Sequence, residues 1–160
     1  MSEAKQKRPF LPPRWFVRAA WVIHRAIYRF TAGRMGLWKV KPGKWGTMRL
    51  TTVGRRSGVE RNAILGYYED GPNLITLAMN GWAKPEPAWW LNLQARPDVT
   101  VVLSDGERKV HGRAATGAER DRLWARWGEF SDQYDAWAAM RSVQTAVVVL
   151  EPRADAPVAA

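Results

Sequence analysis

The chain of 160 residues contains no cysteine and only two histidines, His24 and His111. Without thiols there is no disulfide framework, no thiolate metal site, no iron–sulfur cluster and no cysteine nucleophile. Two histidines are too few for a histidine-based metal cage, so no metal site is expected. The lack of cysteine is typical of proteins of the reducing cytoplasm, which is the expected location.

Long apolar runs and the common catalytic signatures are missing as well. No stretch of about eighteen apolar residues is free of charges, so no membrane-spanning helix is expected. Arg18 and Arg25 interrupt the first apolar segment, which argues against a secretory signal. The sequence has no P-loop, no G-x-S-x-G elbow, no strand-linked G-x-G-x-x-G and no H-E-x-x-H motif. These absences exclude the usual hydrolase, nucleotide-hydrolysing and zinc-protease templates.

Positive charge is plentiful and unevenly placed. Residues 1–65 hold 15 basic and 2 acidic side chains, a net charge of +13, whereas residues 66–160 carry −3. A field of this kind attracts nucleic acid, anionic lipid or a polyanionic small molecule. Ten tryptophans add large flat surfaces that could bind any of the three.

Six short β-prone segments separated by turns predict a small antiparallel barrel with helices packed around it. We expect a tail over 1–13, an amphipathic helix over 14–31, the barrel domain over 32–152 and a tail over 153–160. Thr116 and Glu119 fit a capping box that opens a helix to about Gly128. The predicted strands are Met48–Val53, Arg61–Glu69, Asn73–Ala78, Val99–Leu103, Glu107–Ala115 and Thr145–Leu150; further helices are expected over 88–96 and 131–141.

The predicted helix over 14–31 has two distinct faces. Its basic stripe is edged by aromatic side chains, as in helices that lie in a membrane interface. Packing of the apolar face on the domain is the alternative, and the two interpretations are compatible. The stripe consists of Arg14, Arg18, Arg25 and Arg29; its borders are Trp15, Trp21 and Tyr28; the apolar face is Phe16, Ala19, Ala20, Ile23, Ile27 and Phe30.

Two local motifs could bind a ligand. The Gly-bounded turn 54–58 presents Arg55, Arg56 and Ser57, with Arg61 on the next strand, and three guanidiniums make a good clamp for phosphate or carboxylate. A solvated hairpin tip is the alternative. Downstream, Trp89 with Asn92 could hold a planar heterocycle, although taken alone the pair favours core packing of the tryptophan with a local asparagine cap.

Taken together, five segments resemble the deazaflavin-dependent nitroreductase family, whose members use coenzyme F420. The segments are LTTVGRRSGVER (50–61), YYEDGPNLITLA (67–78), PAWWLNLQARPDVTV (87–101), GAERDRLW (117–124) and VVVLEP (147–152). The resemblance implies a mainly β fold, a six-stranded antiparallel split β-barrel of the FMN-binding type with an N-terminal amphipathic helix. The cofactor is a polyanion, which agrees with the charge of residues 1–65.

The resemblance also implies a role for individual residues. Met79 and Trp82 replace smaller or polar residues of the family pattern, which favours a planar, apolar acceptor such as a quinone. The arginine usual before the last strand is absent from Ser142–Ala146. By resemblance, Arg55, Arg56, Ser57 and Arg61 hold the phosphate and polyglutamate tail; Asn62, Ala63, Ile64, Leu65, Gly66, Leu77, Ala78, Met79 and Asn80 line the deazaflavin ring; Trp89 and Asn92 close the site; Trp82, Tyr134 and Trp137 face the substrate, with Tyr134 the candidate proton donor.

The expected function is that of an F420H2-dependent reductase, which transfers a hydride to a quinone or nitroaromatic-like acceptor. The expected partners are that acceptor, a second copy of the chain, and an anionic membrane surface bound through residues 14–31 on the inner face of the cell membrane. One alternative is a split barrel that binds FMN, heme or lipid without catalysis. A nucleic-acid-binding module is less expected, because the aromatic residues do not alternate along the strands.

Overall fold

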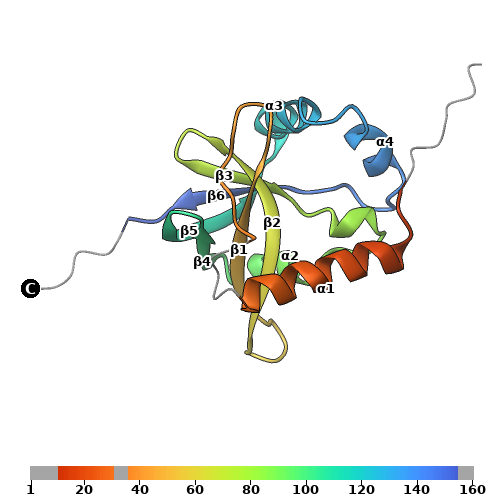
Figure 1. Cartoon of the computed structure of the whole chain (residues 1–160). Coiled ribbons are helices and arrows are strands. Elements are labelled where there is room, and N and C mark those ends of the chain that lie inside the picture. The colour runs from red at the N-terminus through yellow and green to blue at the C-terminus, as the bar shows by residue number, and fades with distance from the viewer. Residues whose placement is uncertain (1–10, 31–35, 155–160) are drawn as a thin grey trace, which may run out of the picture.

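Six antiparallel strands form a closed barrel in the computed structural model, which describes residues 11–30 and 36–154 (Figure 1). Around the barrel the order is β1-β2-β3-β6-β5-β4, and β1 pairs with β4 to close it. The predicted six-stranded antiparallel barrel is confirmed, with every strand end within two residues of its predicted place. The strands are β1 (Gly46–Val53), β2 (Glu60–Asp70), β3 (Asn73–Leu77), β4 (Asp98–Leu103), β5 (Gly106–Ala114) and β6 (Val147–Pro152).

Helices surround the barrel on several sides. Figure 1 shows α3 on one side of the barrel and α1 on the opposite side. None of the helices within the described ranges combines the length and the hydropathy needed to cross a bilayer. The expected tails at 1–13 and 153–160 lie largely outside the described residues. The helices are α1 (Arg14–Phe30), the 3-10 turn η1 (Asn80–Trp82), α2 (Ala88–Ala95), α3 (Gly117–Gly128) and α4 (Tyr134–Ala139).

Strand alternation divides the buried side chains between two cores. Successive strand residues point to opposite faces, so Val148 and Leu150 of β6 fill the barrel while Val147 and Val149 face outward. The outward pair is also fully buried, because α3 and α4 cover that face with Leu123 and aromatic side chains. This double burial explains why β6 is a continuous apolar run.

Helix α2 packs closely against the barrel. Trp90 and Leu93 belong to the same buried cluster as the interior of the barrel. The approach depends on Gly112 of β5: a Cβ placed there would lie 2.6 Å from Leu93 Cδ2 and 2.8 Å from its Cγ. A glycine at 112 therefore makes room for α2, which in turn carries Trp89 and Asn92.

The predicted capping box at the start of α3 is wrong. Thr116 is the N-cap residue, but its side chain makes no capping hydrogen bond. Glu119 instead accepts two hydrogen bonds from Arg113, at 2.7 and 2.8 Å, and the same guanidinium donates to Glu151 at 2.7 Å. A bidentate ion pair of this kind is stronger than a neutral cap, so it takes the carboxylate away from the helix end.

Helix α1 does not bury the apolar face that was expected to pack on the domain. Phe16 is 54% exposed and Ile23 59% exposed, whereas Val17 is half-buried. Val17 Cγ1 lies 3.5 Å from the point that a Cβ on Gly81 would occupy, so the side of the helix that bears Val17 faces η1. The side chains of residues 24, 25 and 27–30, which include the rest of the predicted arginine stripe, lie outside the described residues.

The close approach of α2 predicts that Gly112→Ala lowers the free energy of unfolding by about 1–3 kcal/mol, the usual cost of overpacking. Gly128→Ala is the matched control, because a Cβ at Gly128 meets nothing within 4 Å. That change should be neutral or stabilise α3 by up to about 1 kcal/mol. Urea denaturation followed by tryptophan fluorescence measures both, and equal stability of the two variants would contradict the close-packing argument.

Candidate functional site

The turn between β1 and β2 is closed by its own backbone. The Gly54 N–H donates to the Val59 carbonyl and the Gly58 N–H to the Gly54 carbonyl, both at 2.8 Å. Gly58 has a φ of 68°, a conformation that glycine adopts without a Cβ clash. The side chains of Arg55 and Arg56 at the tip are exposed, so an anion can reach their guanidiniums.

A buried asparagine ties this turn to α2. Asn92 is 4% exposed, and its Oδ1 accepts a hydrogen bond from the Arg55 backbone N–H at 3.1 Å. Its Nδ2 donates to Thr52 Oγ1 at 3.4 Å. The amide thus spans from α2 to two positions of the β1–β2 hairpin. Asn92 therefore fixes the position of the arginine-bearing turn relative to α2. It does not act as the local cap considered from the sequence.

A groove of about 530 Å³ runs from the turn toward α2. Three guanidiniums line it and no acidic side chain does, so its potential is positive within the described structure. Arginine presents N–H groups in a planar fork that matches phosphate and carboxylate oxygens. The lining residues are Gly54, Arg55, Arg56, Ser57, Arg61, Asn62, Ala63, Asn80, Pro87, Ala88, Trp89 and Asn92.

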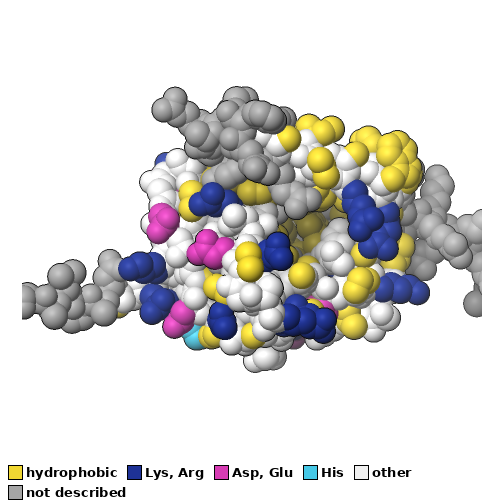
Figure 2. Space-filling model, turned by 90° about the horizontal axis from the view of Figure 1, so that it is seen from below, with side chains coloured by type: hydrophobic (Ala, Val, Ile, Leu, Met, Phe, Trp, Pro, Cys, Tyr) yellow, Lys and Arg dark blue, Asp and Glu magenta, His cyan; other side chains and the backbone are white. Residues whose placement is uncertain are grey.

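A second, larger cavity of about 660 Å³ continues from the groove between the barrel and α1. Five residues border both spaces: Asn62, Ala63, Asn80, Pro87 and Trp89. Figure 2 shows a hollow on this side of the molecule, with hydrophobic side chains inside and basic side chains near its rim. The two spaces together suit a ligand with a flat apolar ring at one end and negative charges at the other.

Residues of helix α1 and seven aromatic side chains line the larger cavity. Arg14 and Arg18 of α1 border it, and no acidic residue of the described chain does. The aromatic residues on its walls are Phe16, Trp21, Trp38, Trp45, Trp89, Trp127 and Tyr134, of which Trp38 and Trp45 pack against each other with ring centroids 6.3 Å apart. Such walls favour a planar ligand.

The loop after β3 borders both spaces and has an uncommon backbone. Asn80, Gly81 and Trp82 have φ values of 48°, 59° and 63°. A left-handed conformation is strained for a bulky residue such as Trp82, and such strain persists only where neighbouring contacts enforce it. The loop therefore needs an external constraint.

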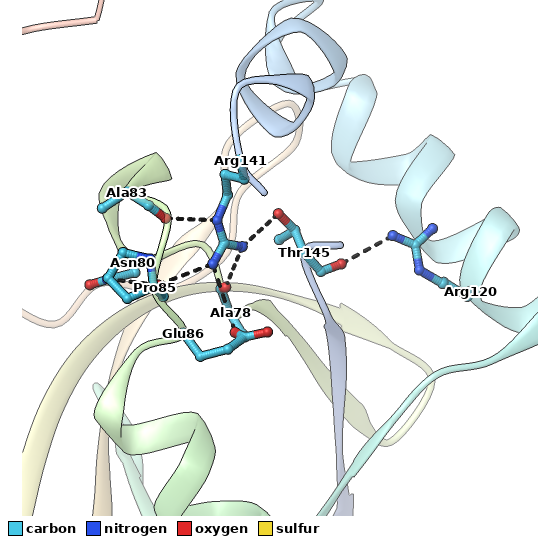
Figure 3. Close-up of polar contacts among 8 residues, drawn as sticks. All are labelled: Ala78, Asn80, Ala83, Pro85, Glu86, Arg120, Arg141 and Thr145. Atoms are coloured by element: carbon cyan, nitrogen blue, oxygen red, sulfur yellow. Dashed lines mark hydrogen bonds and ion pairs between the residues drawn. The ribbon is translucent and has the colours of Figure 1, made fainter. Parts of the chain in front are cut away.

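That constraint is the guanidinium of Arg141, which follows α4 (Figure 3). Its side chain is fully buried. Nε donates to the Ala83 carbonyl at 2.8 Å, and Nη1 donates to the Ala78 carbonyl at 2.9 Å and to Thr145 Oγ1 at 2.8 Å. Nη2 reaches the Pro85 carbonyl at 3.3 Å. One side chain thus satisfies three loop carbonyls and ties the loop to the segment before β6.

Two more contacts complete this network. Glu86 lies 3.7 Å from the guanidinium and supplies the opposite charge that a buried cation needs. Burial lowers the pKa of Arg141, and Glu86 opposes that shift. Asn80 Nδ2 donates to the Pro85 carbonyl at 2.9 Å and closes the loop on itself.

The substrate-facing side of the cavity differs from the expectation. Tyr134 lies on its wall, but Trp82 and Trp137 do not. Both rings pack against Tyr134, with centroids 5.5 and 5.8 Å away, inside the core that α3 and α4 cover. The left-handed backbone at Trp82 accompanies this inward packing, so Trp82 supports Tyr134 and does not narrow the pocket.

The structure brings the other predicted residues together. Every predicted cofactor residue except Ala78 borders one of the two spaces, and Ala78 contributes the carbonyl that Arg141 binds. Arg55, Arg56, Ser57, Arg61 and Asn92 border the groove only; Ile64, Leu65, Gly66, Leu77 and Met79 border the larger cavity only; Asn62, Ala63, Asn80 and Trp89 border both.

Sequence reasoning missed Arg141, Trp127 and the cavity residues Trp21, Trp38 and Trp45 in their roles at the site. Arg141 was placed at the end of a predicted helix, where a charge is ordinarily solvated. One signal points to it: the family that the sequence resembles usually has an arginine before the last strand, and Arg141 stands one position before the segment 142–146.

Comparison with known proteins gives consistent matches. The sequence model of the F420H(2)-dependent quinone reductase family matches residues 21–152. The F420H(2)-dependent quinone reductase Rv1261c of Mycobacterium tuberculosis (strain ATCC 25618 / H37Rv) is 31% identical over 147 residues, which cover 88% of this chain and 97% of that protein.

Solved structures agree on the fold. An F420-H2 dependent reductase, FDR-A, superposes with a TM-score of 0.59 at 25% identity, over 66% of this chain and 93% of its own. A domain-swapped dimer superposes with a TM-score of 0.61 at 23% identity, over 84% of this chain and 99% of its own, and shows the fold alone.

The Arg141 network predicts that Arg141→Met lowers the free energy of unfolding by roughly 3–5 kcal/mol, because it leaves Glu86 and several buried carbonyls without their partner. Arg122→Met is the matched control. Arg122 pairs with Asp70 at 2.9 Å, but its side chain is 57% exposed, so its loss should cost less than about 1 kcal/mol. Chemical denaturation curves give the free energy of unfolding of both variants. A similar loss of that free energy in the two would contradict a special role for the buried arginine.

Proposed function

The chain belongs to the F420H(2)-dependent quinone reductase family, and we propose from this premise that it passes a hydride from reduced coenzyme F420 to a quinone or another planar acceptor with carbonyl-type oxygens. It is an oxidoreductase, and coenzyme F420 is its cofactor. The observation that carries the proposal is the continuity of an arginine-lined groove with an apolar, aromatic-walled cavity.

The residues present fit this cofactor. A tail of phosphate and carboxylate groups needs cations in contact with water, and Arg55, Arg56 and Arg61 supply three. A planar ring needs an apolar slot with backbone groups near it, and residues 62–66 of β2 with Met79 and Asn80 border such a space. When bound, the reduced cofactor supplies the hydride, which is two electrons and one proton.

The residues of the chain then have three tasks. The groove binds the tail, the cavity walls orient the flat acceptor and exclude water, and Tyr134 supplies the remaining proton. Tyr134 is 9% exposed, and burial raises the pKa of its hydroxyl above the usual value. It therefore stays protonated at physiological pH and is available as a donor.

The placement of the aromatic rings supports a small-molecule ligand. Single-stranded nucleic acid stacks on rings spread along an open basic surface. Here Trp89, Trp127 and Tyr134 are at most partly exposed, and they line one cavity. Binding of FMN or heme is an outcome of the cofactor titration below.

Helix α1 adds a membrane-binding surface to the proposal. Trp15, Phe16, Val22 and Ile23 are 54–70% exposed and lie on one broad side of the helix. Arg14 and Arg18 are also exposed. Apolar side chains flanked by arginines suit the boundary of an anionic bilayer. Because α1 forms a wall of the cavity, a membrane-bound α1 would bring the cavity close to lipid-soluble acceptors.

Two further expectations stay predictions. A homodimer has no support beyond the fold that this chain shares with the domain-swapped dimer. The cytoplasmic location and the inner face of the cell membrane also remain to be tested, and localisation of a tagged chain would test both.

The groove predicts that Arg55→Ala with Arg56→Ala weakens binding of coenzyme F420 by about 1.5–3 kcal/mol for each charge-assisted hydrogen bond lost, which is roughly tenfold or more in Kd. The fold should persist, because both side chains are exposed. The control is Arg108→Ala with Arg153→Ala, which removes the same charge away from the groove and the cavity. Fluorescence titration gives both Kd values.

Equal weakening of cofactor binding in the two double variants would mean that overall charge, and not the groove, attracts the cofactor.

The same protein preparation serves to test catalytic turnover. Oxidation of reduced coenzyme F420 is followed by absorbance with a panel of quinones and nitroaromatics, and parallel titrations use FMN and heme. Tight binding of coenzyme F420 without turnover of any acceptor would contradict the reductase proposal.

The exposed face of α1 predicts reversible binding to anionic vesicles, strongest at low salt, with about 1 kcal/mol from each arginine at the surface. Val22→Asp with Ile23→Asp should abolish it, because both side chains are exposed on α1. Val143→Asp, an exposed valine outside α1, should leave it intact. Co-sedimentation with neutral and anionic vesicles measures the fraction of protein that binds. Binding that stays the same in the α1 variant would refute the role of this helix.

A further inference from the structure

The segment that leads from α1 into β1 carries two exposed tryptophans. Trp38 is 46% exposed and Trp45 38% exposed, and their ring centroids lie 6.3 Å apart with the ring planes tilted by 35°. Lys41 and Lys44 exchange two backbone hydrogen bonds, at 3.0 and 2.9 Å, so the tryptophans stand on the two arms of a small hairpin. Both tryptophans border the larger cavity. A ligand in that cavity can therefore contact their rings.

Backbone contacts with β1 hold this hairpin in place. The Trp38 N–H donates to Thr47 Oγ1 at 3.0 Å, and the Thr47 N–H donates to the Trp38 carbonyl at 3.0 Å. Thr47 Oγ1 in turn donates to the Gly36 carbonyl at 2.9 Å. A Cβ placed on Gly46 would lie 2.7 Å from the Trp38 carbonyl oxygen, so the two segments pack backbone to backbone. The position of the hairpin therefore does not depend on the exposed indole of Trp38.

The tryptophan pair lies at the end of the cavity away from the arginine turn. Trp45 Cε3 and Cζ3 lie 3.0 and 3.3 Å from the point that a Cβ on Gly66 would occupy, so the indole covers β2 at Gly66. Asn62, on the same strand, borders both the groove and the cavity. Four residues of a strand span about 13 Å. A ligand with its charged tail in the groove therefore has the tryptophan pair near its opposite end.

This end of the cavity offers apolar surface, and its two threonine hydroxyls are already used. Thr47 Oγ1 is bonded as described above, and Thr76 Oγ1 donates to the Gly66 carbonyl at 2.7 Å. Both threonines are buried. Exposed aromatic surface beside a binding cavity is a common sign of a ligand-contacting patch, because covering it removes apolar area from water. An apolar group suits this end better than a polar one.

We propose that the Trp38–Trp45 pair binds an apolar chain carried by the ring of the quinone acceptor. The two residues thereby set a preference for alkyl-substituted quinones over quinones without a chain. This inference rests on the proposed function. The acceptor ring lies in the cavity beside the cofactor, and its chain runs over Trp45 toward Trp38. The chain takes no part in bond making, so the pair contributes to acceptor binding and not to hydride transfer.

Two quinones that differ only in the chain test the pair. The probes are 2-methyl-1,4-naphthoquinone and its 3-hexyl derivative, titrated without lipid into the full chain loaded with oxidised coenzyme F420. Calorimetry gives both Kd values. Each methylene group that the rings cover lowers Kd about fourfold, so the hexyl quinone should bind about tenfold or more tightly. Trp38→Ala, which keeps the backbone bonds to Thr47, should bring the two Kd values within about threefold of each other and leave that of the methyl quinone unchanged.

Trp124→Ala is the matched control, because Trp124 is a partly exposed tryptophan that borders neither the groove nor the cavity. It should keep the preference for the hexyl quinone. A second measurement needs no variant: a hexyl quinone with a diazirine at the chain end, photolysed in the unmodified protein, should label Trp38 or Trp45. Equal Kd values for the two quinones in the unmodified protein overturn the inference. A preference that Trp38→Ala leaves intact, or labelling confined to other segments, overturns it as well.

Turnover separates this inference from the proposed function. If the chain preference and the labelling are found but no acceptor is reduced, the proposed function fails and the binding site for the chain stands. If both quinones are reduced with the same kcat and KM, the reductase stands and the role of the tryptophan pair fails.

Discussion

The buried guanidinium of Arg141 is the interaction on which the site depends. The loop from Ala78 to Glu86 leaves the sheet at the end of β3, so its carbonyls have lost their strand partners. Arg141 satisfies three of them and bonds to Thr145, which leads into β6. This arrangement holds Asn80, at a φ of 48°, against both the groove and the cavity. A buried cation is costly unless it is fully hydrogen-bonded, and here the backbone of the loop does most of that bonding.

The two parts of the site differ in polarity and in exposure to water. The guanidiniums of the β1–β2 turn are exposed to water, so binding an anion there would carry no large desolvation cost. The cavity is apolar and aromatic, so polar interactions inside it act in a low dielectric and are stronger. Asn92 connects the two parts, because it reaches from α2 to the backbone of Arg55. The two parts of the site are therefore mechanically linked.

Helix α1 is both a wall of the cavity and an exposed apolar surface. Val17 and Trp21 border the cavity, while Trp15 and Val22 face solvent. An amphipathic helix ordinarily buries its apolar stripe on the domain. Here the aromatic cavity takes the side of the helix that carries Arg14 and Arg18, so the broad apolar side stays uncovered. The proposed membrane-facing role rests on this exposed side of the helix.

The sequence by itself determined the strands and the arginine turn. These features are local: alternation with a period of two marks a strand, and Gly54 and Gly58 bound a turn whose tip must carry Arg55 and Arg56. Only the tertiary structure decided the roles of Trp82, Trp127, Glu119 and Arg141. Each depends on a contact outside its own local motif. Arg113 of β5 binds the Glu119 carboxylate in place of the helix cap, Trp82 packs on Tyr134 in the core, and Arg141 donates to carbonyls about sixty positions earlier. A side chain's direction in such places follows from packing and hydrogen-bond satisfaction over the whole molecule, and no local pattern encodes it.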